Sequence, residues 1–411
     1  MHNVEPTVFT LDNGLRVSYL HDPSIVAHLG VVVKAGSRYE QENEEGLAHF
    51  LEHCIFKGTK NRRAFHVLSR LDSVGGELNA YTTKEEICVY SSFTTEHFKR
   101  ASNLLADIML NSTFPENEIQ KEKEVVLDEI NSYLDSPSDK IFDEFESYLF
   151  PNHPLGNNIL GTVESVQSFQ REDLIRYVDK FFYPENMVIS FIGNIESKTV
   201  IKKLNADFGK FSHQKEPVSA VQASHIIPFF VNKSEANFQS HILIGGAAPG
   251  YNHPDRRVFN LIINLLGGPA LNSRLGLSIR EKYGYTYNIE ANYTPFEEIG
   301  YWNVYAGTDP KYRVKTINLI YKEIQKFIEK PLTDGQLKKA KQQMKGHLAL
   351  GMDNNAGLML NFGKSLLIFN EIDTIAEIYE QIDRITTNDI QNVAAEFFKN
   401  DSLSQLSYTI K

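Results

Sequence analysis

The sequence predicts two homologous domains of the α/β or α+β class. The chain has 411 residues. Because this is longer than a domain with a single compact core usually is, two domains of roughly 200 residues are expected. Strand-like apolar runs alternate with amphipathic helix-like stretches in each half, which is the pattern of sheets covered by helices. The second half also repeats the order of the first, which indicates a duplicated domain rather than a solenoid.

The repeat is visible in two pairs of segments. Residues 28–37, HLGVVVKAGS, form an apolar run that ends in a turn, and residues 241–250, HILIGGAAPG, have the same pattern 213 residues later. Residues 89–109 and 303–324 each combine a strand, a turn and an amphipathic helix. A spacing this long is the size of a whole domain.

The boundary between the halves is expected in a polar segment that contains proline. We predict domains at 1–212 and 228–411, joined by a linker at 213–227. The predicted strands are 15–20, 26–35, 86–93, 187–194, 239–246 and 300–307. The predicted helices are 44–57, 62–73, 96–110, 116–134, 255–266 and 310–329.

Bulk properties exclude several classes of protein. The net charge of -10 argues against a nucleic-acid binder, because phosphate contacts require clustered Lys and Arg. No apolar run approaches the ~18 residues of a membrane span, and the N-terminal segment lacks the pattern of a signal peptide. We therefore expect a cytoplasmic protein that binds neither membrane nor nucleic acid. Cys54 and Cys88 are too few for a disulfide framework and are interpreted as buried apolar residues.

Residues 43–58, NEEGLAHFLEHCIFKG, predict a helix that carries two histidines on one face. Asn43 is the expected N-cap. His49 and His53 are four residues apart, so both imidazoles can bind one zinc ion at ~2.0–2.1 Å. Glu52 falls on the neighbouring flank, where its carboxylate can reach a water without ligating the metal. This His-x-x-Glu-His order is that of the inverzincins.

Two histidines do not complete a hydrolytic zinc site, which typically has three protein ligands and one open position. The best candidate for the third is the helical run at 118–130, EIQKEKEVVLDEI. Glu122 and Glu129 are seven residues apart on one face, with Ile119 and Val126 on the same stripe. Partial burial of carboxylates costs free energy unless a cation neutralises them, and a zinc ion would do so. Alone, such a pair of glutamates is more often a solvated helix face.

Taken together, these features resemble the pitrilysin/insulinase family of inverzincin metallopeptidases over almost the whole chain. The bacterial and mitochondrial-processing-peptidase-like branch is the most similar in length. The resemblance implies an α+β fold of the α/β-sandwich type, in which two duplicated domains each contain a mostly antiparallel sheet packed with helices. The matching stretches are LDNGLRV, GLAHFLEHCIFKGT, GGELNAYTTKE, EKEVVLDEI, HPLGNNILGT, FYPENMVISFIGNI and SRLGLSIREKYGYTY.

The resemblance assigns roles to residues of the first half. It implies that His49 and His53 ligate one Zn²⁺ ion per chain, with Glu129, 76 residues beyond His53, as the third ligand. It makes Glu52 the general base. Glu122 would support the metal site from behind the ligands.

The resemblance also identifies residues that would hold the substrate. The segment 76–81 resembles an edge strand that receives the substrate backbone, with Asn79 and Ala80 as contacts. Arg280 and Tyr287 of the second half match an Arg and a Tyr, seven residues apart, that reach the scissile carbonyl. Without the resemblance, Arg280 would be interpreted as an ordinary surface charge and Tyr287 as an ordinary strand aromatic. Asp139 stands where related processing peptidases often have a glutamate, and its role is left open.

The function implied is that of a zinc-dependent endopeptidase. It would hydrolyse internal bonds of peptides or unfolded segments enclosed between domains, as a homodimer. One alternative is a catalytically inactive scaffold or partner subunit of the same fold. A second alternative is a module whose zinc ion is purely structural, which would require four protein ligands, commonly including Cys. The side chain of Cys54 leaves its helix about 100° away from that of His53, which disfavours the second alternative.

Overall fold

A computed structural model describes residues 5–211, 218–223, 225–235 and 238–410. Residues 213–217 and 224 of the predicted linker, together with the predicted boundary at residue 212, lie outside these described residues, so the domain limits stay predictions. No helix among the described residues is long and apolar enough to cross a membrane. The chain divides into two compact units: the first is Met1–Asn131, Asn157–Val221 and Leu350–Ile375, and the second is Ser132–Gly156, Gln222–Ala349 and Ala376–Lys411.

The first unit is built on a six-stranded mixed sheet with the order β1-β2-β6-β3-β5-β4. The strands β2 and β6 run parallel, and every other neighbouring pair is antiparallel. The strands are β1 (Thr7–Thr10), β2 (Arg16–His21), β3 (Val26–Val33), β4 (Glu77–Thr82), β5 (Ile87–Thr94) and β6 (Met187–Gly193). The central strand β3 is covered on both faces, which explains its apolar run from Leu29 to Val33.

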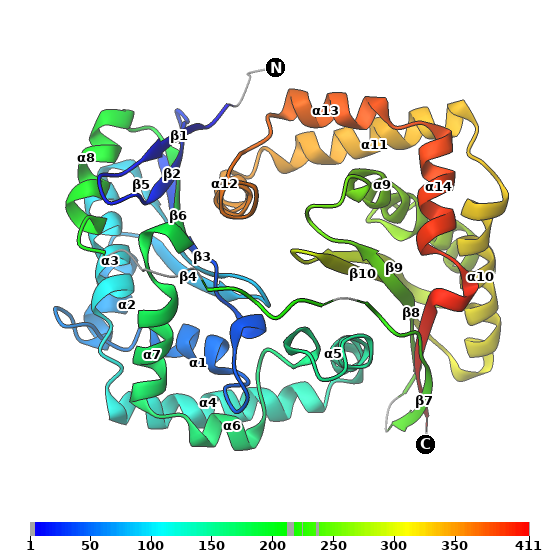
Figure 1. Ribbon diagram of the computed structural model, residues 1–411, viewed down its shortest axis with the longest axis horizontal. Helices are drawn as coiled ribbons and strands as arrows, with labels where there is room; N and C mark the ends of the chain where they lie inside the picture. The colour runs from blue at the N-terminus through cyan, green and yellow to red at the C-terminus, as the bar shows by residue number, and fades with distance from the viewer. Residues whose placement is uncertain (1–4, 212–217, 224, 236–237, 411) are drawn as a thin grey trace. The chain divides into compact units, whose positions relative to one another are not determined.

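Helices of the first unit pack on this sheet (Figure 1). The α-helices are α1 (Leu47–Cys54), α2 (Ala64–Asp72), α3 (Phe98–Asn111), α4 (Glu116–Leu134), α6 (Val163–Ser168), α7 (Arg171–Phe181), α8 (Ser197–Phe208) and α12 (Asn355–Phe369). The short 3₁₀ turns are η1 (Ser37–Tyr39), η2 (Thr95–His97) and η4 (Pro184–Asn186). One large apolar core joins the sheet to α1, α2, α3, α4, α7 and α8.

The helix α12 comes from the C-terminal part of the chain but packs on β3 and β6 of the first sheet. Its Leu366 joins Val32 and Val188 in a small apolar cluster. The contact is close, because a Cβ on Gly363 would lie 2.9 Å from a methyl carbon of Val32. Glycine therefore lets this helix lie directly against the strand.

The second unit is built on a five-stranded mixed sheet with the order β7-β11-β8-β10-β9. Its strands are β7 (Phe230–Glu235), β8 (Ser240–Pro249), β9 (Thr286–Pro295), β10 (Ile299–Thr308) and β11 (Leu403–Ile410). Its helices are α5 (Pro137–Leu149), α9 (Arg256–Gly267), α10 (Arg313–Glu329), α11 (Asp334–Gly351), α13 (Ile375–Arg384) and α14 (Thr387–Phe397). Shorter turns are η3 (Pro154–Gly156), η5 (Gly276–Glu281), η6 (Pro310–Tyr312) and η7 (Asn400–Ser402).

The two sheets confirm the predicted duplication. The order β2-β6-β3-β5-β4 corresponds strand for strand to β7-β11-β8-β10-β9, and each order contains one parallel pair at the same place. The helix α5 packs on β8 and β11 of the second sheet, as α12 packs on the first. Each half of the sequence thus supplies one helix to the other half's sheet. The fold class is the predicted α+β sandwich with mostly antiparallel pairing.

All predicted strands and helices are present, with ends within three residues of those expected. The predicted helix start at Asn43 is wrong. Asn43 has a positive φ of 71°, and α1 begins at Leu47 after Gly46, whose φ is 93°. The chain turns sharply there, and a Cβ on Gly46 would lie 2.6 Å from the carbonyl oxygen of Leu160. Only glycine suits this left-handed, crowded position.

Candidate metal centre

The start of the histidine-bearing helix α1 is held by Glu40. The buried Glu40 carboxylate accepts hydrogen bonds from the backbone N–H groups of Gly46, at 3.0 Å, and Ala48, at 2.8 Å. These are donors that a helix leaves free at its first turn. Burial raises the pKa of Glu40 to about 8, although both hydrogen bonds and Lys84 oppose this rise. A side chain outside the helix therefore does the capping expected of Asn43.

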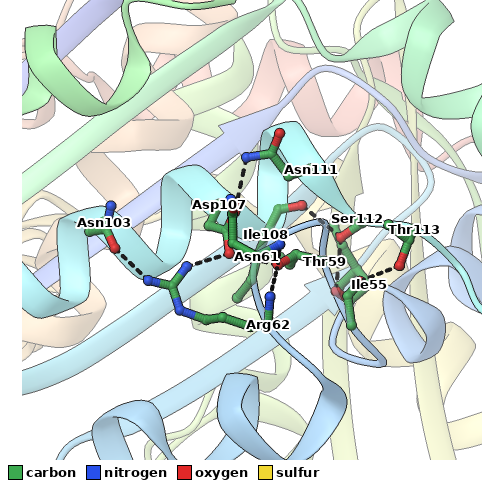
Figure 2. Close-up of polar contacts among 11 residues, drawn as sticks. Ile55, Thr59, Asn61, Arg62, Asn103, Asp107, Ile108, Asn111, Ser112 and Thr113 are labelled. Carbon is green, nitrogen blue, oxygen red and sulfur yellow. Dashed lines mark hydrogen bonds and ion pairs between the residues drawn. The ribbon is translucent and has the colours of Figure 1, made fainter.

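The segment that follows α1 is held by a polar network around Asp107 of α3 (Figure 2). The buried Asp107 carboxylate accepts hydrogen bonds from Thr59, at 2.7 Å, and Asn111, at 2.9 Å, and from Asn61, and it forms an ion pair with Arg62. These hydrogen bonds keep the pKa of Asp107 low against the effect of burial, which would raise it. The network therefore connects the turn between α1 and α2 to the main core.

We expect Asp107→Ala to lower the free energy of unfolding by about 3 kcal/mol. The substitution leaves Thr59 and Asn61 without this acceptor and removes the charged partner of Arg62, whose guanidinium keeps its hydrogen bond to Asn103. Urea unfolding of the zinc-free protein measures the change. Asp128→Ala on the exposed face of α4 is the control, and its effect should stay within about 0.5 kcal/mol. If both variants lose the same free energy of unfolding, the network around Asp107 does not stabilise the fold more than an exposed side chain does.

Three predicted ligands converge in the first unit. One ligand atom from each of His49, His53 and Glu129 lies within 4.8 Å of the others. A Glu129 oxygen is 3.8 Å from His49 Nε2 and 3.5 Å from His53 Nε2. The histidines come from α1 and the glutamate from α4, so the packing of two helices forms the group (Figure 1).

These distances fit zinc. Ligands bound tetrahedrally at ~2.0–2.1 Å are separated from one another by about 3.4 Å. Two imidazole nitrogens and a carboxylate oxygen are common zinc donors, and three protein ligands leave a fourth position open. Burial and the neighbouring His53 lower the pKa of His49 to about 4. His49 is therefore neutral at neutral pH, which is the form that binds metal.

Behind the ligands, Glu122 joins His53 to a lysine. Glu122 is buried; one of its oxygens is 3.3 Å from His53 Nδ1, and the other is 2.6 Å from Lys57 Nζ. An acceptor at Nδ1 orients the ring and leaves Nε2 free to face Glu129. Lys57 neutralises the buried carboxylate from the turn that follows the end of α1 at Cys54.

We expect Glu122→Gln to weaken zinc binding by about 10–100-fold, the usual cost of losing a carboxylate behind a ligating histidine. Glutamine has the same shape, but it has no charge to pair with Lys57. Competition against a chromophoric chelator measures the affinity, and Glu124→Gln, exposed on the same helix, is the matched control. Unchanged affinity in Glu122→Gln would remove Glu122 from the metal site.

Glu52 shares the helix with the two histidines. Burial raises the pKa of Glu52 above its usual value, although Thr82 and His53 oppose this rise, and Glu129 adds a smaller increase. Glu52 also lies close enough to Cys88 and Tyr90 of β5 to contribute to the raised pKa of each, which burial mainly causes. A carboxylate with a raised pKa is a better proton acceptor at neutral pH.

The strand β4 runs along the edge of the sheet beside this helix. Its Asn79 and Ala80 pair with Tyr90 and Val89 of β5, and no strand lies on its other side in the described part of the chain. The helix α1 packs against β4. The resemblance placed an edge strand at 76–81, and the structure has it at Glu77–Thr82.

The remaining predicted residues belong to the second unit. Arg280 lies in the π-helical turn η5, where its guanidinium contacts Glu281 at 2.9 Å. Tyr287 is fully exposed at the start of β9, at a bulge where the register with β10 shifts. Bulges often redirect side chains near functional sites. Asp139 lies in the first turn of α5, where its carboxylate accepts a hydrogen bond from Ser136, and it takes no part in the group of three ligands.

Comparison with known proteins identifies the family. A family model described as insulinase (peptidase family M16) matches residues 16–163, and one described as peptidase M16 inactive domain matches residues 168–344. The uncharacterized zinc protease YmxG of Bacillus subtilis is 32% identical over 396 residues, which cover 96% of both chains. The chain belongs to the insulinase family, peptidase family M16. An uncharacterized zinc protease of Rickettsia bellii is 31% identical over 97% of this M16 protein and 96% of its own length.

Solved structures show the same fold. A protease from Helicobacter pylori matches this M16 protein with a TM-score of 0.90 and 21% identity, over 99% of this chain and 100% of the other. An M16-like peptidase from Alicyclobacillus acidocaldarius matches with a TM-score of 0.88 and 22% identity, over 100% and 99%. The three converging ligands fall within the insulinase match, whereas the match to the inactive domain covers most of the second half.

Proposed function

We propose that this M16 protein is a zinc-dependent endopeptidase that hydrolyses internal bonds of peptides or unfolded protein segments. The observation that carries the proposal is the convergence of His49, His53 and Glu129, with Glu52 on the same helix and a free sheet edge beside it. The names of its relatives, which call them zinc proteases, support the same reading. One zinc ion per chain fits the single group of three ligands among the described residues.

The edge strand β4 holds the substrate in this proposal. An extended peptide adds to a free edge through main-chain hydrogen bonds, which do not depend on side-chain identity. Asn79 and Ala80 offer that edge next to α1. Peptides and unfolded segments have free backbone groups for this pairing, whereas most backbone groups of a folded protein are already paired.

Glu52 acts as the general base. Its carboxylate takes a proton from the attacking water and delivers it to the leaving amine, which avoids expelling an unstable anion. When bound by His49, His53 and Glu129, zinc would polarise the scissile carbonyl and lower the pKa of a water toward ~7. Arg280 and Tyr287 are proposed to donate hydrogen bonds to the oxygen that gains charge, a role that contributes a few kcal/mol. A homodimer and a cytoplasmic location stay predictions.

The alternative is a catalytically inactive scaffold of the same fold. The match of residues 168–344 to the inactive-domain model is compatible with either function, because that domain name describes the half without the His-x-x-Glu-His motif. The first half keeps all three ligands and Glu52 together, and this geometry favours the enzyme.

Cleavage of peptides with blocked ends separates the two functions. Peptides acetylated at the N-terminus and amidated at the C-terminus present only internal bonds to the enzyme. We expect mass spectrometry to find internal cuts that a chelator abolishes and added zinc restores. Absence of cleavage across a diverse library by the zinc-loaded protein would favour the scaffold.

A further inference from the structure

A groove lies between α2 and the beginning of β4 in the first unit. It has a volume of about 660 Å³. The residues that line it are Phe65, Leu68, Ser69, Asp72, Gly76, Glu77, Leu78 and Asn79. None of these residues is part of the metal group described above.

The floor of the groove is apolar and exposed. Phe65 and Leu68 are three residues apart on α2 and so share a face, where they are 74% and 51% exposed. The core contacts of α2 are made by Val67 and Leu71, which are fully buried. Most of the surface of Phe65 and Leu68 is therefore left uncovered by the fold, and a ligand in the groove could bury it.

The rim of the groove is acidic. Asp72 and Glu77 are exposed, and they are the charged residues among those that line it. Carboxylates beside exposed apolar side chains favour a ligand that carries positive charge next to an apolar group. An acidic segment would be repelled there.

The groove continues the substrate edge. Gly76 to Asn79 line it, and Glu77 to Asn79 are also the first residues of β4. Glu52 lies beside Thr82, the last residue of β4, so the catalytic group faces that end of the strand. Since a strand advances about 3.3 Å per residue, the groove lies about three to five residues along the peptide from that point.

We propose that this groove is a recognition subsite for the substrate. It takes an aromatic or large aliphatic side chain about three to five residues from the cleaved bond, next to a lysine or arginine. This inference rests on the proposed endopeptidase function, because the occupant is the same extended peptide that pairs with β4.

Peptide binding tests the subsite independently of turnover. Fluorescein-labelled peptides with one phenylalanine moved along an Ala/Ser background, next to either Lys or Glu, are titrated into the zinc-loaded Glu52→Gln protein. We expect the peptide with Phe-Lys at one particular position, the preferred register, to bind about 10-fold more tightly than the background peptide. Burial of one aromatic side chain allows a gain of this size. Glu beside the phenylalanine should remove most of this gain.

The double substitution Phe65→Ser and Leu68→Ser, made in the Glu52→Gln protein, should abolish the register preference. Asp72→Asn with Glu77→Gln should remove only the preference for Lys over Glu. Ile25→Ser, which also replaces an exposed apolar residue of the first unit, is the control and should keep both preferences.

Two results would overturn the subsite. One is a register preference that persists in the Phe65 and Leu68 double variant. The other is loss of self-association in that variant, measured by sedimentation, without any change in peptide binding, which would make the groove a contact between copies of the chain. Failure of the endopeptidase proposal is a separate result, namely zinc-loaded wild-type protein that binds the preferred peptide but does not cut it.

Discussion

Glu52→Gln protein should bind zinc as wild type does and cleave a blocked peptide about 10²–10⁴-fold more slowly, the usual contribution of a general base. Glu52 lies on α1 between the two histidines but is not one of the three converging ligands. Glutamine preserves the shape of the side chain and cannot accept the proton of the attacking water. Metal analysis and kcat/KM on a quenched peptide measure the two properties.

Glu124→Gln is the matched control, because it makes the same change at an exposed position of α4. It should keep both zinc and activity. Activity near the wild-type level in pure Glu52→Gln protein would contradict the assignment of the base. Loss of zinc in that variant would instead place Glu52 among the ligands.

Glu129→Gln should bind zinc more than about 100-fold more weakly, exceeding the 10–100-fold cost of losing a partner behind a ligand. Its carboxylate faces both histidine Nε2 atoms, at 3.8 and 3.5 Å. The side chain is 44% exposed, so its replacement should hardly disturb the zinc-free fold. The zinc-dependent rise in melting temperature should therefore shrink at a fixed zinc concentration.

Chelator competition gives the affinity of Glu129→Gln directly, and melting of the zinc-free variant provides the control for stability. Wild-type affinity in this variant would show that another residue is the third ligand. A large loss of stability without zinc would show that Glu129 has a structural role instead.

The fold was largely predictable because its strongest signals are local and repeated. The strand β3 is apolar from Leu29 to Val33, since α12 and the main core cover its two faces. Its counterpart β8 has the same pattern in the second half. The pattern could not show that α5 and α12 each pack on the other half's sheet, because periodicity predicts a helix and not its partner.

The candidate site was predictable where helical spacing decides geometry. His49 and His53 share a face because they are four residues apart, and Glu122 and Glu129 because they are seven apart. Lys57 could not be found by such spacing, because α1 ends at Cys54 and Lys57 lies in the turn beyond it. Glu40 could not be found either, because it reaches the start of α1 through a turn whose shape depends on Gly46 and on contacts distant in the sequence.

The most direct measurement of the central claim is a titration of zinc-free protein with zinc while cleavage of a blocked peptide is followed. Activity should be absent without metal and should rise linearly to an end point at one zinc per chain. Cleavage by the metal-free protein would contradict the account. So would saturation with zinc, measured by metal analysis, without any cleavage of a diverse peptide library.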